Sequence, residues 1–207
     1  MRQPTSLLRL LLPLAMLTAP PALWPAAAPA QRAAPKLAEA VFSGGCYWGV
    51  ESVFRHVRGV VTATSGYALP VPAQGSAYAP RAEAVRVAYD PRQVTYRQLL
   101  EVFFSVVHDP TQLNRQGPDV GSDYRSIVFV DGERRRAIVR AYIDSLTAAR
   151  VFPRPIVTEI AALRGFQVVD DSQQDYAAKH PSDAYIVIND VPKVEALRDR
   201  FPQLYRD

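Results

Sequence analysis

The pattern of apolar and polar residues predicts several short strands after residue 36. Apolar residues alternate with polar ones, or run together, in segments that end at Gly, Pro or Asp, which is typical of strands. Two later segments of this kind are expected to form edge strands. The expected strands are Leu37–Phe42, Val60–Thr64, Val85–Tyr89 and Ser126–Val130, with edge strands at Ile156–Ile160 and Phe166–Val169.

Other segments carry apolar residues three and four positions apart, the spacing of one helix face. The first begins at Cys46, and the second begins at Thr95, where Gln98 three residues later completes a capping box. Two shorter polar segments near the C-terminus are expected to form helical turns. The expected helices cover residues 46–57, 95–107 and 133–147, with helical turns at 172–179 and 194–200.

Two segments between these elements are expected to be loops. Ala68–Pro80 is rich in Pro, Ala and Gly, and His108–Ser122 is long and polar. Long loops in compact domains are often functional. Strands and helices mix without a regular βαβ alternation, and the sequence shows no internal repeat. The fold class expected is α+β, a two-layer sandwich with a central mixed sheet (a ferredoxin-like plait) and helices packed on it.

The first thirty residues have the organisation of a secretory signal peptide. Arg2 supplies positive charge, Leu7–Leu17 is mainly apolar, and Ala28–Ala30 offers a small-residue cleavage site before Gln31. Prolines interrupt the run of about 20 apolar residues that a membrane-spanning helix needs, so no membrane span is expected after processing. The sequence predicts a signal peptide at 1–30, a linker at 31–36 and a single domain at 37–207, in a periplasmic or secreted protein.

Composition narrows the class of protein. Hydrophobic residues make up 48% and charged residues 21% of 207 residues, which is ordinary for a soluble globular domain. The net charge is +4, and removing Arg2 and Arg9 with the leader lowers it to +2. Basic residues cluster only at Arg134–Arg136, so nucleic acid is not expected as a partner. No phosphate-binding loop and no cluster of metal ligands is evident, and a monomer is expected.

The chain contains one cysteine, Cys46, and so cannot form an internal disulfide. Gly44 and Gly45 allow a sharp turn before it. The start of a helix lowers the pKa of a thiol, so a reactive thiolate is expected there. A buried structural cysteine is the alternative on count alone. Tyr47 and Trp48 are expected to wall an apolar pocket, although aromatic residues more often fill a core.

A series of motifs carries a specific resemblance. The run Gly44–Glu51 resembles the active-site signature of the A-type peptide methionine sulfoxide reductases, which usually reads GCFWG. The resemblance covers the chain from about Leu37 to the end. The further matching segments, in order, are Gly66-Tyr67, Ala82–Val85, Tyr89–Pro91, His108–Thr111, Asn114–Ser126, Thr158–Ile160 and Gln174–Tyr176.

The resemblance implies reduction of methionine S-sulfoxide, free or in proteins, to methionine. It implies that Cys46 attacks the sulfoxide sulfur and becomes a sulfenic acid. It also implies roles for other residues: Glu83 protonates the oxygen, Tyr124 forms a hydrogen bond with it, and Asp119 lies near the thiol. The residues implied to bind substrate are Tyr47 and Trp48, which hold the S-methyl group, and Tyr78, the one candidate for a second tyrosine of the family.

The chain also departs from the family pattern. It lacks C-terminal resolving cysteines, so an external thiol reductant is expected, either a thioredoxin-like protein or a small thiol, and no bound cofactor. Arg81 stands where the family usually has histidine, and the usual histidine of the C-terminal motif is replaced in Ser172-Gln173-Gln174. Ala68-Leu69 replaces a usual glycine pair. These changes leave open a sulfoxide- or thioether-binding module without turnover. A Cys–His hydrolase with His108 or His180 as base is the other alternative.

Overall fold

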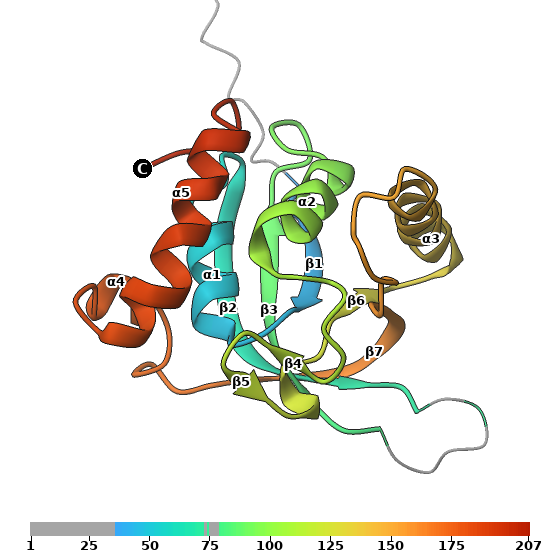
Figure 1. Cartoon of the computed structure of the whole chain (residues 1–207), viewed down its shortest axis with the longest axis horizontal. Coiled ribbons are helices and arrows are strands. Elements are labelled where there is room, and N and C mark those ends of the chain that lie inside the picture. The colour runs from blue at the N-terminus through green and yellow to red at the C-terminus, as the bar shows by residue number, and fades with distance from the viewer. Residues whose placement is uncertain (1–35, 73, 75–78) are drawn as a thin grey trace, which may run out of the picture. The chain divides into compact units, whose positions relative to one another are not determined.

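The structure, a computed structural model, describes residues 36–72, 74 and 79–207 (Figure 1). The segment Pro35–Asp207 forms one compact unit. The predicted signal peptide, the linker up to residue 35 and Tyr78 lie outside the described residues. Within the described part of the chain, no helix has the length and apolar character needed to cross a membrane.

Five strands form a mixed sheet that closes on itself in the order β1-β3-β2-β7-β6. Only β6 and β7 run parallel, and β1 pairs with both β3 and β6. The predicted mixed sheet with helices packed on it is confirmed. The predicted ferredoxin-like plait is not observed: the sheet of such a plait is open, whereas this sheet is closed. The strands are β1 (Ala38–Ser43), β2 (Val60–Pro70), β3 (Ala82–Tyr89), β6 (Ile127–Val130) and β7 (Glu159–Val168).

Two strand predictions are corrected by pairing across the sheet. The two expected edge strands overlap a single strand, β7, which begins only at Glu159, so Ile156–Thr158 is not part of any strand. Strand β7 pairs with β2 on one side and β6 on the other. The expected loop 68–80 begins later, because Ala68 pairs with Ala82 and Tyr67 pairs with Glu83. Glu83 therefore lies on a strand instead of at the end of a loop.

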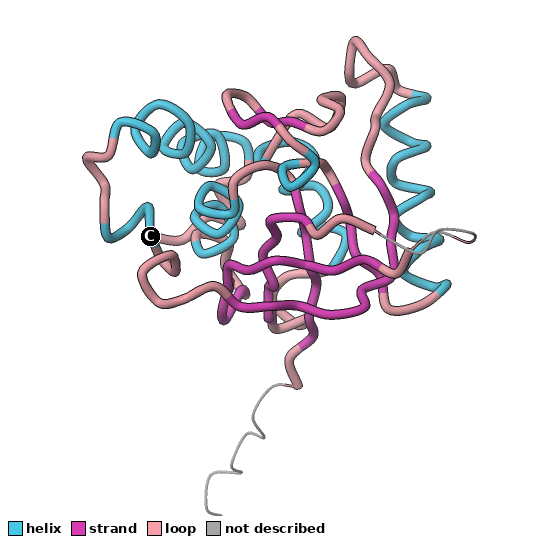
Figure 2. The backbone as a smooth tube through the Cα atoms, turned by 90° about the horizontal axis from the view of Figure 1, so that it is seen from below, coloured by secondary structure: helices cyan, strands magenta, loops and turns pink. Residues whose placement is uncertain are grey.

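The helices lie on both sides of the sheet, and Figures 1 and 2 show α3 apart from the group formed by α1, α4 and α5. The predicted capping box at Thr95 is confirmed. The helix that follows it changes to a π-helical turn, η1, for its last five residues. The helical elements are α1 (Tyr47–Arg55), α2 (Tyr96–Val102), η1 (Phe103–Val107), η2 (Ser122–Tyr124), α3 (Glu133–Ala148), α4 (Tyr176–Lys179), η3 (Ile186–Asp190) and α5 (Val191–Arg200). Two short strands, β4 (Arg115–Gln116) and β5 (Asp119–Val120), pair in the predicted long loop.

Stacked phenylalanines fix helix α1 relative to strand β1. The ring centroid of Phe42 lies 5.0 Å from that of Phe54 and 4.9 Å from that of Phe103. All three side chains are fully buried. Such pairs contribute about 0.5–1.5 kcal/mol each beyond the burial of their area. They hold the turn between β1 and α1, where Cys46 lies, in a fixed position.

Candidate active site

Cys46 caps the N-terminus of α1, in the turn that leaves β1. Gly45 adopts a φ of +98°, which favours glycine, and its N–H donates to the carbonyl oxygen of Tyr124 at 3.2 Å. A Cβ on Gly45 would lie 2.7 Å from Cγ of Gln116. The sharp turn predicted from the two glycines is therefore confirmed. It leaves Cys46 only 9% exposed.

The expectation of a resting thiolate at Cys46 is wrong. Burial raises the pKa of the Cys46 thiol well above its usual range, and the charge of Glu83 raises it further, whereas the N–H of Trp48 lowers it. A helix terminus contributes at most about 2 kcal/mol. Full burial can shift a pKa by 3–5 units, or about 4–7 kcal/mol. Burial wins, and the resting thiol is protonated.

Glu83 lies beside this thiol, on β3. Its side chain is buried, and its Oε2 accepts the N–H of Tyr47 at 3.0 Å. Burial raises the pKa of Glu83 to about 7, helped by the charges of Asp119 and Asp123, while hydrogen bonds from Tyr47 and the Cys46 thiol lower it. The raised pKa that a general acid requires is therefore present. At neutral pH this carboxyl can both accept and donate a proton.

Tyr124 and Asp119 come from the loop segment that covers the thiol. Burial raises the pKa of Tyr124 to about 12, and the charges of Glu83 and Asp119 add to the effect. The phenol therefore stays protonated at any working pH and is available as a hydrogen-bond donor. Asp119 Oδ2 accepts the hydroxyl of Tyr185 at 2.5 Å.

Tyr185 is a residue of this site that the sequence did not indicate. Its hydroxyl bonds to Asp119, and its ring lies edge-on to Trp48 with centroids 5.8 Å apart. Burial raises its pKa, and the hydrogen bond to Asp119 and the charge of that residue add to the effect. Tyr185 begins the short apolar run Tyr185–Ile188, which matched no expected element and no motif of the family, so nothing in the sequence marked it as a site residue. The structure thus brings together Cys46 and Glu83 with Tyr124, Asp119 and Tyr185.

Tyr47 and Trp48 belong to a layer of aromatic rings beside the thiol. Trp48 stacks on Tyr176 with centroids 3.8 Å apart, and Tyr47 lies edge-on to Tyr67 at 6.1 Å. Gln173 Oε1 accepts the indole N–H of Trp48 at 3.2 Å and the hydroxyl of Tyr47 at 3.4 Å. Gln173, in the region where the family usually has histidine, therefore orients both rings.

Arg81, the other departure from the family pattern, also contacts this layer. Its guanidinium carbon lies 3.8 Å from the centroid of the Tyr67 ring, which is a cation–π distance. Its Nε also pairs with Asp123 at 3.4 Å. Arg81, Tyr47, Tyr67 and Gln173 line the same surface cavity. These two of the departures, Arg81 and Gln173, thus share one cavity beside the aromatic layer.

The histidines do not form a Cys–His pair. His108 is buried, with Nδ1 3.0 Å from the carbonyl oxygen of Phe103 and Nε2 2.6 Å from the Ser126 hydroxyl. A carbonyl oxygen only accepts, so Nδ1 carries the proton and Nε2 accepts from Ser126. Burial lowers the pKa of His108 to about 4. His180 stacks on Tyr176, and within the described residues neither histidine bonds to Cys46.

An ion pair lies directly against the last glycine of the cysteine motif. Lys193 Nζ is 3.1 Å from Oδ1 of Asp190, whose side chain is buried. A Cβ on Gly49 would lie 2.1 Å from that Oδ1 and 2.6 Å from Nζ. Only glycine allows α1 to approach this pair so closely. Asp190 and Lys193 were not indicated by the sequence, because the contact joins distant segments.

Comparison with known proteins agrees with this geometry. The family described as "Peptide methionine sulfoxide reductase" matches residues 38–204. The chain is 45% identical over 183 residues to peptide methionine sulfoxide reductase MsrA 2 of Mesorhizobium japonicum, covering 86% of this chain and 94% of that protein. It is 46% identical over 172 residues to the MsrA of Natronomonas pharaonis, covering 80% and 96%. The solved methionine sulfoxide reductase A of Corynebacterium diphtheriae is similar with a TM-score of 0.58 and 33% identity, over 73% of this chain and 78% of that one.

Proposed function

The chain belongs to the peptide methionine sulfoxide reductase family, and we propose that in this member Cys46, Glu83 and Tyr124 carry the chemistry. The protein is a thiol-dependent peptide-methionine (S)-S-oxide reductase. The observation that carries the assignment is one buried thiol beside one buried carboxyl whose pKa is raised to about 7.

Glu83 acts as a proton relay between thiol and substrate. Because the resting thiol is protonated, its proton must leave as the sulfur attacks. Glu83, ionised at and above neutral pH, takes this proton, and the same carboxyl then delivers it to the sulfoxide oxygen. One residue therefore serves as base and then as acid within a single step, and no proton from bulk water is needed.

The step balances with one thiol and one sulfoxide. The Cys46 sulfur bonds to the substrate sulfur, and the sulfoxide oxygen takes the thiol proton through Glu83. The oxygen then moves to the Cys46 sulfur, while its bond to the substrate sulfur and the new sulfur–sulfur bond both break. Methionine leaves, and Cys46 becomes a sulfenic acid. The substrate sulfur is reduced by two electrons and the cysteine sulfur is oxidised by two.

The surrounding rings orient the sulfoxide. Tyr124 donates a hydrogen bond from its hydroxyl to the sulfoxide oxygen. Asp119, which accepts the Tyr185 hydroxyl at 2.5 Å, fixes the loop that presents Tyr124. Tyr47 and Trp48 provide the apolar contact for the S-methyl group, with Gln173 fixing their orientation. The pocket therefore recognises the polar oxygen and the apolar methyl group on different sides.

The reductant comes from outside the chain. Cys46 is the only cysteine of the sequence, so its sulfenic acid has no internal thiol to react with. Two external thiols reduce it in turn, giving water and an external disulfide. A thioredoxin-like protein or a small thiol supplies them. In the proposed location, outside the cytoplasm, the enzyme repairs oxidised exported proteins. Support for that location is the leader pattern of Arg2, Leu7–Leu17 and Ala28–Ala30.

A single-turnover experiment tests this assignment. Protein from Gln31 onward is mixed, without any thiol, with an excess of each epimer of a blocked methionine sulfoxide. We expect one methionine per chain from the S epimer, none from the R epimer, and one dimedone adduct at Cys46 by mass spectrometry. Cys46→Ser yields neither. Methionine formed without oxidation of Cys46 would contradict the mechanism, and S-epimer binding without methionine would favour a binding module.

A further inference from the structure

Two rings of the active site are held by one short turn, residues 173–176, which follows strand β7. At the start of the turn, Gln173 accepts the indole N–H of Trp48 at 3.2 Å and the hydroxyl of Tyr47 at 3.4 Å. At its end, the ring of Tyr176 stacks on the indole with centroids 3.8 Å apart. The turn thus contacts the Trp48 side chain both at its N–H and on its face. The position of the turn therefore sets the orientation of the rings that we assign to the S-methyl group.

The turn contains a residue in an uncommon backbone conformation. Asp175 has a φ of +55°, in the left-handed region that residues other than glycine rarely adopt. Such a conformation costs free energy and persists only where the surrounding contacts hold it in place. The contacts of Asp175 therefore determine whether the turn keeps its shape.

Glu51, on α1, holds the main chain of this turn. It is 2% exposed, and its Oε2 accepts the N–H of Asp175 at 3.0 Å. The same oxygen accepts the hydroxyl of Ser65, on β2, at 2.9 Å. A buried carboxyl group is costly unless it is hydrogen-bonded, and these two donors meet that requirement. One carboxyl oxygen thus connects the helix, the sheet and the turn.

Two further contacts reach the turn from β2 and α1. The side chain of Gln174 donates to the carbonyl oxygen of Ser65 at 2.8 Å and accepts the N–H of Ser65 at 2.9 Å, which fixes the turn on β2. Arg55 pairs with Asp175 at 2.5 Å, but the Arg55 side chain is 45% exposed, and exposed ion pairs contribute little to stability. The hydrogen bond to Glu51 is therefore expected to hold Asp175 more firmly than the ion pair does.

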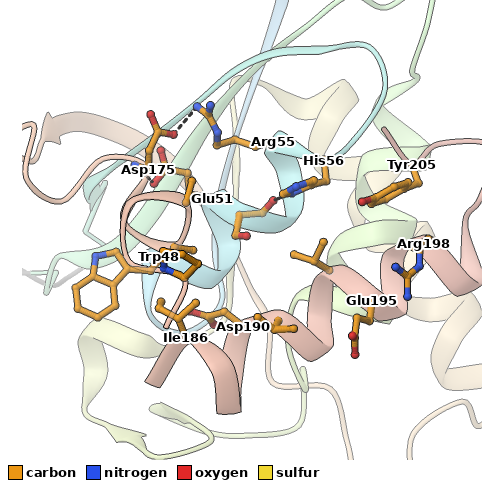
Figure 3. Close-up of a pocket in the computed structure, with 16 residues that line it drawn as sticks. Trp48, Glu51, Arg55, His56, Asp175, Ile186, Asp190, Glu195, Arg198 and Tyr205 are labelled. Atoms are coloured by element: carbon orange, nitrogen blue, oxygen red, sulfur yellow. Dashed lines mark hydrogen bonds and ion pairs between the residues drawn. The ribbon is translucent and has the colours of Figure 1, made fainter. Parts of the chain in front are cut away.

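Glu51 and Trp48 are three residues apart on α1, so both side chains lie on one face of the helix. In Figure 3, Trp48, Glu51 and Arg55 follow one another along α1, and Asp175 lies beside Glu51 and Arg55. These four residues line the same cavity, of about 370 Å³. A single helix thus carries both the indole ring and the group that holds the turn against it.

We propose that Glu51 is a positioning residue of the reductase. It holds the turn 173–176 through Asp175, and through this turn it sets the orientation of Trp48 and Tyr47. Glu51 therefore acts on substrate binding and not on the reacting atoms. The role in substrate binding rests on the proposed function, whereas the positioning of Trp48 is a property of the protein without substrate.

Substitutions that remove the carboxyl group test the effect on substrate binding. Glu51→Leu and Glu51→Ala lack an acceptor for the N–H of Asp175 and differ in size, whereas Glu51→Gln keeps one oxygen that can accept it. The rate of Cys46 oxidation by the S epimer is measured in single turnover over a range of substrate concentrations. We expect the half-saturating concentration to rise at least about tenfold in Glu51→Leu and Glu51→Ala, because a hydrogen bond to a buried carboxyl group is lost. The limiting rate stays within about threefold, because the rings contribute equally to binding before and during the reaction.

The conservative variant and a matched control make this result specific. Glu51→Gln is expected to remain within about threefold of the wild type in both constants. Arg55→Gln removes the ion pair with Asp175, leaves the hydrogen bonds of Glu51 in place, and is expected to leave both constants unchanged. An unchanged half-saturating concentration in Glu51→Leu and Glu51→Ala, or no recovery in Glu51→Gln, would overturn the proposal. So would a limiting rate that falls as far as the half-saturating concentration rises.

A double-mutant cycle tests whether the effect passes through the turn. Gln173→Ala and Tyr176→Leu together remove both contacts of the turn with Trp48. In that background, Glu51→Leu is expected to raise the half-saturating concentration by less than about threefold, because the connection to Trp48 is already lost. A further increase of about tenfold in that background would show that Glu51 acts by another route, and it would contradict the proposal.

Fluorescence tests the positioning of Trp48 without any turnover. In a full chain with Trp24→Phe, Trp48 is the only tryptophan, so quenching by acrylamide reports how freely its ring is reached. In Glu51→Leu and Glu51→Ala, shown to be folded by far-UV circular dichroism, we expect the quenching constant to rise at least about twofold. In Glu51→Gln it is expected to be unchanged. An unchanged constant in the folded variants would refute the role of Glu51, whereas a wild type that does not reduce the S epimer would refute the proposed function alone.

Discussion

Replacing Glu83 by glutamine separates the chemical role of this carboxyl from its structural one. Glutamine keeps the size of the side chain, and its amide oxygen can still accept the Tyr47 N–H that Glu83 accepts at 3.0 Å. The turn that carries Cys46 is therefore retained. What is lost is the group that takes the thiol proton and passes it to the sulfoxide oxygen.

The structure sets the size and direction of two effects. Loss of a positioned acid–base group lowers rates by about 10²–10⁴, or roughly 3–5 kcal/mol of barrier. The charge of Glu83 also raises the pKa of Cys46. Its removal therefore lowers that pKa, and each unit of decrease gives about tenfold more thiolate below the pKa. Glu83→Gln is thus expected to be a poorer reductase with a more reactive thiol.

Two assays read these effects in one preparation. Single-turnover reduction of the S epimer gives the rate constant of the chemical step, and the rate of iodoacetamide alkylation at pH 8 gives thiol reactivity. In the wild type, kcat/KM is expected to rise about tenfold per pH unit up to about pH 7, where Glu83 ionises, and then to level off. Glu83→Gln loses this acid limb. Glu39→Gln, at an exposed position on β1, is the matched control.

The combination of slower reduction and faster alkylation is specific to the relay. A merely structural role would slow both reactions or neither. If Glu83→Gln alkylates more slowly than the wild type, or keeps both kcat and the acid limb, the relay is wrong.

Two further substitutions address other contacts. Gly49→Ala is expected to lower the free energy of unfolding by roughly 1–3 kcal/mol, because the new Cβ meets the Asp190–Lys193 pair. Chemical denaturation measures this change. Gly165→Ala is the control expected to be tolerated, because its Cβ would lie 3.8 Å from the nearest neighbouring atom. His108 has a pKa lowered to about 4, so the unfolded chain binds its proton first as pH falls from about 6.5 to 4. The difference between the pKa of His108 in the folded and the unfolded chain removes about 3 kcal/mol from the free energy of unfolding across this pH range. In His108→Asn, denaturation measured as a function of pH is expected to lack this loss of stability. The kcat of the variant is expected to change little. A His108→Asn variant with wild-type pH dependence, or a Gly49→Ala variant as stable as Gly165→Ala, would contradict these two assignments.

Local signals in the sequence predicted local features of the structure. Thr95 and Gln98 are three residues apart, and their capping box forms as expected. The glycines before Cys46 give the predicted sharp turn, and the motif resemblance indicated Glu83, which lies beside the thiol. In each case the information lies within a short segment or a shared motif.

Features that depend on tertiary packing were not predictable in this way. The pKa of Cys46 is raised because the folded chain buries it, and burial is not visible in the motif. Strand β7 was divided into two predicted strands because Arg164 and Gly165 interrupt its apolar pattern, although pairing with β2 and β6 holds it together. Tyr185 and Asp190 reach the site from distant positions without any sequence pattern.

The closed sheet has a consequence for how readily this protein can pair with a second chain. An open sheet ends in strands with unpaired N–H and C=O groups, which serve as templates for pairing with a second chain. Here each of β1, β2, β3, β6 and β7 has a neighbour on both sides. Within the described residues, the segments of this sheet without a strand on one side are short, such as Ala38–Ala40 of β1 and Val60–Ser65 of β2. The closed topology thus leaves little strand edge for pairing with a second chain.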